Sequence, residues 1–296
     1  MPAALKAGFE HKIWDAQHEC IKRPALEELQ LERLRKQLSR MQDHIPYYAQ
    51  KLKAAGVAPD DITSLDDVKR LPFTTKADLR DHYPFGTFAS PLKEVVRLHA
   101  STGTTGKPTV VGYTRHDMEV WTELVARFLV GGGLSDEDIV QIAFGYGLFT
   151  GGFGLHYGCE RVGATVIPAS SGNTERQIML MRDLGSTALV CTPSYAVYLA
   201  EALKKLDIPP GELNLRVGFF GGEFWSDAIR KKIEEQLGII ATDNYGLSEV
   251  VGPGVCGECL MQEGMHIGED HFLLEIVDPE TLEPVPDGEK GEVVIT

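Results

Sequence analysis

The stretch that decides the fold is ALVCTPSYAVYLAEALKKLDIPPGELNLRVGFFG, residues 188–221. Short, mostly apolar runs at 188–192 and 217–221 flank an amphipathic segment at 194–205. Apolar runs of this length are typical of buried strands, and the longer segment between them is typical of a helix. A strand–helix–strand unit of this kind predicts two parallel strands with the helix packed on one face of their sheet.

The same alternation continues on both sides of this unit. Strands are expected at 139–144, 164–168 and 239–242, and helices at 117–130, 151–162, 173–184 and 225–237. The repeated pattern predicts an α/β fold in which a parallel sheet carries helices on both of its faces.

The N-terminal end follows a helical pattern instead. One apolar stripe is formed there by Leu31, Leu34, Leu38, Met41 and Ile45. Pro46 ends or kinks this helix, and Gly56 is the expected C-cap of a second one. The stripe spans only about two heptads, so packing within its own domain is favoured over a coiled coil.

The C-terminal end reads as strands at 272–278 and 292–296, joined by a turn-rich stretch. Three segments are therefore expected: an N-terminal helical segment at 1–94 packed on the core, an α/β core at 95–255 that binds nucleotide and acid, and the start of a β subdomain at 256–296. Because the last residues form an apolar, β-prone run, the subdomain looks truncated.

Composition limits the classes of function. The 296 residues are 43% hydrophobic and carry a formal net charge of −14, which makes the chain as a whole a poor binder of nucleic acid or of membrane surfaces. No apolar run approaches the roughly 18 residues of a membrane span, and five cysteines argue against a disulfide scaffold. We expect a cytoplasmic protein. The charge is uneven: residues 1–53 sum to +3 and residues 257–296 to −10.

The run ASTGTTGKPT at 100–109 is rich in glycine and small hydroxyl residues and contains one lysine. Glycines let the backbone approach a ligand, and successive N–H groups and hydroxyls can surround phosphate oxygens. The run is not a Walker A loop, because only two residues separate its glycines and a proline follows the lysine. These residues alone fit a phosphate loop and a flexible surface loop about equally.

Two further turns follow predicted strands, FFGGE at 219–223 and TDNYGLSE at 242–249. Ligands of open α/β sheets collect at the carboxyl ends of the strands. A Tyr-Gly turn that ends in a carboxylate could stack a ring on a base and offer Glu249 to a metal ion. The structural alternatives are a plain Gly-Gly turn and an ordinary loop with a solvated glutamate. The turn is not a hydrolase elbow, because Val250 stands where the last glycine would be.

The run FGYGLFTGGFGLHYG at 144–158 interleaves aromatic residues with glycines. Aromatic faces with small residues between them leave a slot for a flat ring. The alternative is a helix start that packs in the core, and the two interpretations are compatible. Within the run, Phe144, Tyr146 and Gly152 are the favoured pocket residues, and His156 is the only histidine.

Together these runs resemble the acyl-adenylate-forming (AMP-binding) superfamily and, within it, the phenylacetate–CoA ligases. The resemblance is carried by STGTTGKPTVVGYT at 101–114, FGYGLFTGGFGLHYG at 144–158, NYGLSEVVGPGV at 244–255 and HIGEDHFLLEIVDPETLEPVPDGEKGEVVIT at 266–296. The first and third runs are typical of the superfamily, and the other two narrow the resemblance to the phenylacetate branch.

The resemblance implies a ligase that activates an aryl acid, phenylacetate first, with Mg-ATP to an acyl-adenylate and then transfers the acyl group to CoA. The implied phosphate loop is Ser101, Thr102, Gly103, Thr104, Thr105, Gly106 and Lys107. The implied catalytic residues are Thr104, Lys107 and Glu249, the last as the Mg²⁺ ligand. The implied adenine site is Gly222, Glu223, Asp243, Asn244, Tyr245 and Gly246, with Tyr245 stacked on the base and Asp243 or Asn244 bound to its amino group. The implied acid site is Phe144, Tyr146, Gly152, Gly221 and Gly246.

A structural zinc site is a further hypothesis. Cys256, Cys259, His266 and His271 can be drawn as a Cys₂His₂ set, but their spacing matches no standard finger. The resemblance implies Cys259 and His266 as two ligands, with other cysteines later in the chain of relatives. Free thiols in a buried loop are the favoured alternative.

The resemblance also implies that this chain is the N-terminal part of a longer ligase. The missing part would hold a carboxylate for the ribose, a hinge arginine and a mobile C-terminal domain with a lysine. A piece without them is expected to bind its ligands but to be weak or inactive. The alternatives are an amide-forming or AMP-transferring relative, and a non-catalytic nucleotide-binding module. Dimerisation through the N-terminal helices stays open.

Overall fold

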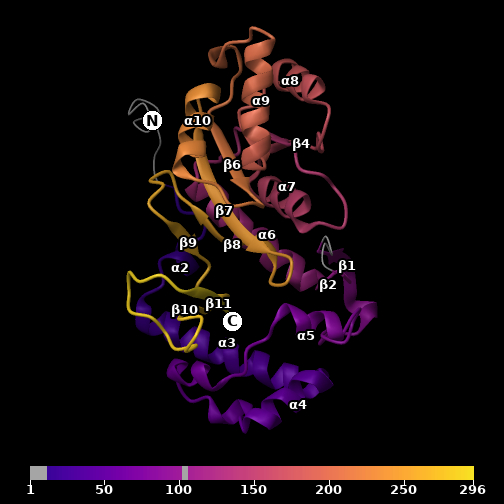
Figure 1. Ribbon diagram of the computed structural model, residues 1–296, viewed down its shortest axis with the longest axis vertical. Helices are drawn as coiled ribbons and strands as arrows, with labels where there is room; N and C mark the ends of the chain where they lie inside the picture. The colour runs from indigo at the N-terminus through magenta and orange to yellow at the C-terminus, as the bar shows by residue number, and fades with distance from the viewer. Residues whose placement is uncertain (1–11, 102–105) are drawn as a thin grey trace. The chain divides into compact units, whose positions relative to one another are not determined.

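The computed structural model describes residues 12–101 and 106–296, and it divides the chain into two compact units (Figure 1). The first unit contains the described residues up to Asp15 and His116–Ile267. The second contains Ala16–Arg115 and Gly268–Thr296. Each unit has its own cluster of buried hydrophobic side chains.

A seven-stranded sheet organises the first unit, in the order β4-β3-β5-β6-β7-β8-β9. The strands are β3 (Ile139–Ile142), β4 (Thr165–Ile167), β5 (Ala188–Cys191), β6 (Val217–Gly221), β7 (Ile240–Leu247), β8 (Gly252–Glu258) and β9 (Met265–Ile267). The neighbours from β4 to β7 are parallel, whereas β8 and β9 join antiparallel. The predicted α/β class with a mostly parallel sheet is confirmed.

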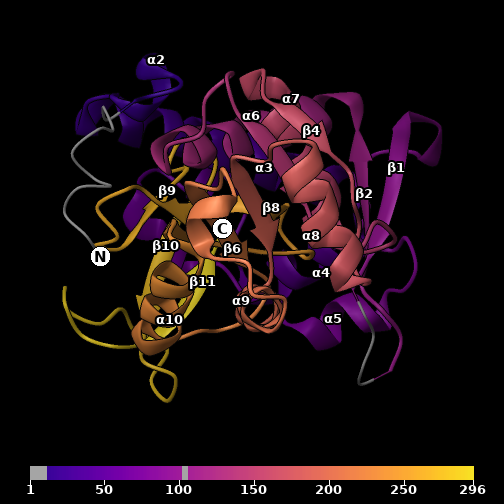
Figure 2. The ribbon, with the colours of Figure 1, turned by 90° about the horizontal axis from the view of Figure 1, so that it is seen from above.

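Helices cover both faces of this sheet. They are α6 (Arg115–Gly131), α7 (Thr150–Val162), α8 (Thr174–Asp183), α9 (Pro193–Lys205) and α10 (Asp227–Leu237), with a 3-10 turn η4 (Pro210–Glu212) before β6. Figure 2 shows α6 and α7 on one side of strands β6 and β8, and α9 and α10 on the other. Every helix of the described residues is too short or too polar to cross a membrane.

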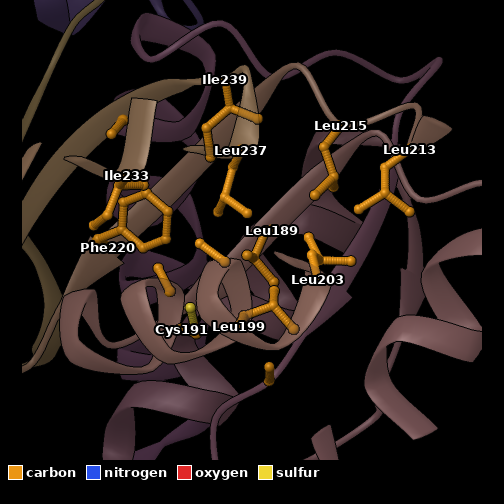
Figure 3. Packing of buried hydrophobic residues seen from close by; sticks show 14 of the residues in the cluster. Leu189, Cys191, Leu199, Leu203, Leu213, Leu215, Phe220, Ile233, Leu237 and Ile239 are labelled. Atoms are coloured by element: carbon orange, nitrogen blue, oxygen red, sulfur yellow. The ribbon is translucent and has the colours of Figure 1, made fainter. Parts of the chain in front are cut away.

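Successive side chains of a strand point to opposite faces of the sheet, so β6 packs against helices on both faces. Phe220 of β6 packs with Leu199 of α9 and Leu237 of α10 in the cluster drawn in Figure 3. Its neighbour Phe219 points to the opposite face of the sheet, toward the end of α6. A Cβ added to Gly132, just after α6, would lie 2.6 Å from the Phe219 ring. Buried strands need apolar residues on both sides, which is why this run reads as continuously apolar.

The second unit begins with α2 (Ala16–Glu19), α3 (Arg23–His44) and α4 (Pro46–Ala55), followed by η1 (Pro59–Asp61), η2 (Leu65–Arg70), α5 (Lys76–Asp81) and η3 (Leu92–Glu94). Its strands form two antiparallel pairs, β1 (Val95–Ala100) with β2 (Val110–Thr114) and β10 (Leu274–Val277) with β11 (Glu292–Ile295). As predicted, α3 ends before Pro46, and Gly56 caps α4 with a φ of 66°. The stripe residues Leu34 and Leu38 pack against Leu52, Val57 and Ile62, so the stripe serves its own unit.

Opposite charges join the two ends of the sequence within the second unit. Arg23 forms an ion pair with Glu269 at 2.9 Å, and Gln30 donates to the Glu269 carbonyl at 2.8 Å. Arg33 approaches the carboxylate of buried Asp270 at 3.6 Å. The basic residues within 16–53 and the acidic residues within 268–296, which the sequence places in separate segments, therefore meet in the second unit.

Glycine allows α7 to pack closely, and this yields a first prediction. A Cβ added to Gly158 would overlap the side chain of Val125 on α6. Gly158→Ala is expected to lower the free energy of unfolding by about 1–3 kcal/mol, because overpacking outweighs the better helix propensity of alanine. Urea unfolding measures the change. Gly211→Ala, with open space around its Cβ, is the matched control and should lie within about 0.5 kcal/mol of the wild type. A more stable Gly158→Ala would contradict the packing argument.

Candidate functional site

The predicted site residues of the first unit come from three stretches, which follow β3 or lie at the ends of β6 and β7. Strands β3, β5, β6 and β7 are parallel, so their carboxyl ends lie at the same edge. From β3, the chain continues on one side to β4 and later on the other side to β5. Such a point, where the connections diverge, is where open α/β sheets bind ligands.

Phe144 and Gly222 meet across this edge. Gly222 has a φ of 82°, a conformation that favours glycine. A Cβ placed there would lie 3.7 Å from the Phe144 ring and 4.0 Å from Cγ2 of Thr192, which follows β5. The structure therefore brings a residue predicted for the acid pocket against the backbone of a residue predicted for the adenine site.

Gly221 and Asn244 are fixed to one another next to this contact. They are partners in the β6–β7 register, and a Cβ on Gly221 would overlap the backbone carbonyl of Asn244. The buried Asn244 side chain donates from Nδ2 to the Phe220 carbonyl at 2.6 Å. This bond orients the amide, so its oxygen Oδ1 is the atom suited to accept from an amino group.

Asp243 precedes Asn244 and lies beside a buried ion pair. Burial, reinforced by the charge of Glu258, raises the pKa of Asp243 to about 6, against the opposing effects of Trp225 and Arg230. The backbone N–H of Asp243 donates to Glu258 Oε2 at 2.8 Å. Glu258 in turn binds Arg230 through contacts of 2.6 and 2.9 Å. The ion pair thus holds the backbone of β7 at the point where the predicted adenine residues begin.

Tyr245 lies in the last part of β7, where it pairs with Cys256 of β8, and Glu249 lies in the turn between the two strands. Tyr245 is 44% exposed, and a half-exposed aromatic ring is a suitable platform for a flat base. Burial, Cys256 and Glu249 all raise the pKa of Tyr245, so the Glu249 carboxylate is close enough to act on the phenol. A Cβ on Gly246 would overlap the Gly252 carbonyl, which requires glycine where the hairpin closes.

The carboxylate of Glu249 fits a Mg²⁺ ligand. Its loop is tied to the start of α7, where the hydroxyls of Thr150 and Ser248 lie 3.4 Å apart. Within residues 12–101 and 106–296, no three His, Cys, Asp or Glu side chains are grouped so as to hold a metal. That finding is compatible with Mg²⁺, which proteins commonly bind through one or two carboxylates together with substrate phosphates.

Glu223 has a structural contact. Its Oε1 accepts from the backbone N–H of Ser194, at the start of α9, at 2.7 Å. Carboxylates at helix N-termini satisfy N–H groups that have no partner within the helix. The bond fixes the turn after β6 to the end of β5, which keeps Gly222 in place.

The glycines of the 144–158 run divide between two tasks. Gly154 and Gly158 face Trp121 and Val125 of α6, so the predicted alternative of close core packing holds for them. Gly152 lies against the carbonyl of Gly145. A Cβ added to Gly152 would lie 2.9 Å from that carbonyl oxygen. The aromatic rings gather before and at the start of α7, with Tyr146 and Phe153 edge to face at 5.2 Å.

The glycine-rich 101–109 loop belongs to the second unit and joins β1 to β2. The Ser101 hydroxyl accepts from the Thr109 backbone N–H at 2.9 Å, and the two backbones also bond at 3.0 Å. Lys107 lies over the Tyr83 ring at 5.5 Å from its centroid. Gly106 has a φ of 143°. The predicted residues Thr102, Gly103, Thr104 and Thr105 lie outside the described residues.

The zinc hypothesis gains no supporting geometry in the described part of the chain. In the β8–β9 register, Cys256 pairs with Ile267 and Gly257 pairs with His266. Because side chains alternate along strands, Cys256 and the exposed His266 point to opposite faces. Cys256 instead contacts the sulfur of Met265 at 3.5 Å.

The mostly parallel sheet with helices on both faces makes this an α/β protein of the class whose ligands bind at the carboxyl ends of the strands. A family model described as AMP-binding enzyme matches residues 28–296, and the chain belongs to this family.

Curated relatives are phenylacetate-coenzyme A ligases. The chain is 53% identical over 273 residues to that of Pseudomonas putida, which covers 92% of this chain and 62% of the relative. It is 50% identical over 285 residues to that of Thermus thermophilus, covering 96% and 64%. The chain therefore spans less than two thirds of the length of these relatives.

Solved structures agree on the fold. A 2-hydroxyisobutyryl-CoA ligase, solved with 2-HIB-AMP and CoA, matches with a TM-score of 0.91 and 29% identity over 96% of this chain and 62% of that one. A benzoate CoA ligase from Burkholderia xenovorans has a TM-score of 0.57 at 19% identity, over 71% of this chain and 41% of that one, and shows the fold alone.

The sequence points to His156 as the histidine of the 144–158 run, but neither to its contact with Tyr146 nor to Glu160. The Tyr146 hydroxyl lies 3.0 Å from His156 Nδ1, and His156 Nε2 lies 3.1 Å from Glu160 Oε1. The four-residue spacing of His156 and Glu160 on a predicted helix was the available signal, because such residues face each other.

The raised pKa of Asp243 gives a pH-dependent prediction. Its value of about 6 in the folded chain exceeds the ordinary 3.8, so the fold favours the neutral acid and loses this contribution as pH rises through 6. Asp243→Asn is expected to be more stable than the wild type at about pH 8 by about 1–2 kcal/mol, after allowance for solvent screening. The gain should shrink as pH falls toward 4 in urea unfolding at each pH.

The exposed Asp183, at the end of α8, supplies the control Asp183→Asn, which makes the same chemical change without burial and should stay within about 0.5 kcal/mol of the wild type. A constant difference between Asp243→Asn and the wild type across this range would contradict the burial argument.

Proposed function

We propose that the whole protein is an acid–CoA ligase that activates an aryl acid, with phenylacetate as the first candidate. Mg-ATP supplies the adenylyl group, and CoA is the final acceptor. The observation that carries the proposal is the identity of 50–53% to phenylacetate-coenzyme A ligases over 92–96% of this chain. The likeness to a CoA ligase solved with an acyl-AMP and CoA supports the same two steps.

The first step joins a carboxylate oxygen of the acid to the α-phosphorus of ATP, and the bond to pyrophosphate breaks. Negative charge spreads over the phosphate oxygens, so the chief requirement is charge neutralisation. Mg²⁺, held by Glu249, supplies part of it when bound. Backbone N–H groups and hydroxyls of the 101–107 loop, with Lys107, hold the β- and γ-phosphates. Tyr245 stacks on the adenine, and Asn244 accepts from its amino group.

The acid binds beside this nucleotide site. Phe144 packs against Gly222, so an aromatic acid held against Phe144 would have its carboxylate close to the nucleotide edge. Tyr146 and Gly152 complete one wall, and the backbones of Gly221 and Gly246 border the α-phosphate. In the second step, the CoA thiolate attacks the acyl carbon, and AMP leaves with the bond electrons.

A second candidate keeps the adenylation step but changes the acid or the acceptor. The observation that favours it is the TM-score of 0.91 to a ligase whose bound intermediate, 2-HIB-AMP, carries a 2-hydroxyisobutyryl group. A non-catalytic nucleotide-binding module is a third candidate for the chain as given. The cytoplasmic location, a role in phenylacetate catabolism, a homodimer and a structural Zn²⁺ stay predictions from the sequence.

Calorimetry on the purified chain separates these candidates. Mg-ATP is titrated with and without phenylacetate, and pyrophosphate release is followed in the same sample. Tighter ATP binding in the presence of phenylacetate, with or without release, supports the aryl-acid proposal. Tighter binding with 2-hydroxyisobutyrate alone favours the second candidate, and ATP binding that no acid affects favours the third. Failure of a folded chain to bind ATP would overturn the proposal for this chain.

The Mg²⁺ role of Glu249 is tested by Glu249→Gln. Loss of the carboxylate removes a metal ligand while preserving side-chain size, so ATP affinity measured with Mg²⁺ should fall about tenfold or more, roughly 1.4 kcal/mol. ATP affinity measured without the metal should change little. Glu235→Gln, at an exposed position of α10, is the control and should bind as the wild type does. Equal Mg²⁺-dependent affinities of Glu249→Gln and the wild type would refute the assignment.

A further inference from the structure

Glu160, His156 and Tyr146 form a hydrogen-bonded chain in the first unit. His156 and Glu160 lie one turn apart on α7, with His156 Nε2 at 3.1 Å from Glu160 Oε1. His156 Nδ1 lies 3.0 Å from the Tyr146 hydroxyl. The rings of Tyr146 and His156 are edge to face at 5.7 Å, and Phe153 abuts Tyr146 at 5.2 Å. Aromatic contacts and hydrogen bonds thus fix the same tyrosine.

The chemistry of the three groups sets the direction of this chain. An ionised carboxylate only accepts, so Glu160 selects the imidazole form with hydrogen on Nε2. In a neutral imidazole the other nitrogen, Nδ1, then accepts. Tyr146 must therefore donate its single hydrogen to His156. Burial raises the pKa of Tyr146, which keeps the phenol protonated as this arrangement requires.

A tyrosine that has given its hydrogen to His156 offers only lone pairs to any other partner. A group that approaches its oxygen must carry a hydrogen. Tyr146 is half-buried and follows Phe144, whose ring reaches Gly222, by two residues. An ordinary surface pair at this helical spacing stabilises its own helix by only a few tenths of a kcal/mol and has no effect on a third residue. Here the exposed Glu160 acts through His156 on a half-buried phenol.

We propose that Glu160 and His156 are positioning residues that make the Tyr146 oxygen a hydrogen-bond acceptor, so that the acid site favours aryl acids with a ring hydroxyl over the matching methyl ethers. This inference rests on the proposed function, because it assumes that Tyr146 borders the bound acid. It deepens that function by naming the ring substituent and the residues that select it.

Calorimetry of the chain with Mg-ATP at about pH 8.5, roughly two units above the pKa of a free histidine side chain, tests the selectivity. The probes are phenylacetate, 3- and 4-hydroxyphenylacetate and the corresponding methoxyphenylacetates. The readout is each Kd divided by the Kd of phenylacetate for the same variant, which removes general losses of affinity. In the wild type, at least one hydroxylated isomer should bind about threefold to tenfold more tightly than its methyl ether.

Glu160→Lys reverses the donor and acceptor roles along the hydrogen bonds that join residue 160, His156 and Tyr146. A lysine only donates, so His156 must accept on Nε2 and carry hydrogen on Nδ1. Tyr146 then accepts from His156 and is left to donate toward the acid. The preference for hydroxyl over methoxy should vanish or invert in Glu160→Lys, and Glu160→Gln, which can still accept, should fall between it and the wild type. Glu235→Lys, the same charge change on α10, should keep the wild-type ratios.

Nitrogen NMR of ¹⁵N-histidine-labelled chain measures the relay without any acid. The His156 signals, identified by their loss in His156→Gln, should show hydrogen on Nε2 in the wild type and on Nδ1 in Glu160→Lys. An unchanged tautomer, or hydroxyl-to-methoxy ratios that do not respond to Glu160→Lys, would overturn the inference. If phenylacetate binds but no variant changes the ratios, the proposed function stands and this inference fails. If no acid binds, the proposed acid site and the proposed hydroxyl selectivity are both refuted. The NMR spectrum then tests only whether Glu160 sets the tautomer of His156.

Discussion

The ion pair between Asp138 and Arg216 aligns the strands on which the candidate site depends. Asp138 precedes β3 and Arg216 precedes β6, and the buried carboxylate also accepts from the Thr187 hydroxyl, just before β5, at 2.7 Å. Arg216 further donates to the Gly133 carbonyl at 2.8 Å. Burial alone would raise the pKa of Asp138, but Arg216, Thr187 and Ser135 outweigh it and lower the pKa. Three parallel strands are therefore joined at their amino ends by one carboxylate, which fixes their positions relative to one another.

A second buried ion pair joins the strands where the sheet changes from parallel to antiparallel. Arg230 of α10 binds Glu258 of β8 and donates to the Ala241 carbonyl of β7 at 2.6 Å. Glu258 accepts the N–H of Asp243, so helix, parallel strand and antiparallel strand share one polar network. A buried pair of this kind gives little net stability but makes a misplaced partner costly. The network therefore acts mainly on position, and the residues it positions are those next to Asn244 and Tyr245.

Much of this arrangement follows from sequence patterns, and the rest depends on contacts between distant residues. The apolar runs at 188–192 and 217–221 predict β5 and β6 because buried parallel strands require apolar residues on both faces. Strand β8, GPGVCGE, escapes prediction because glycine and proline are depleted in strands. The predicted edge needs the strand order as well, since only the placement of β5 between β3 and β6 brings Phe144 to Gly222. Likewise, the opposite charges of the two ends, which the sequence divides between separate segments, do not indicate that Arg23 meets Glu269.

Helix α7 reconciles the two interpretations of the aromatic and glycine run. Its glycine side, Gly154 and Gly158, brings the helix backbone into contact with α6, since any side chain there would overlap Trp121 or Val125. Close packing of this kind fixes the rotation of a helix as well as its distance. The opposite side is thereby held in one orientation, and it carries His156 and Glu160. Because the core packing holds α7 in place, His156 and Glu160 on this helix can position Tyr146, which lies before it. Gly154 and Gly158 thus remove the freedom of the helix that borders the predicted acid pocket.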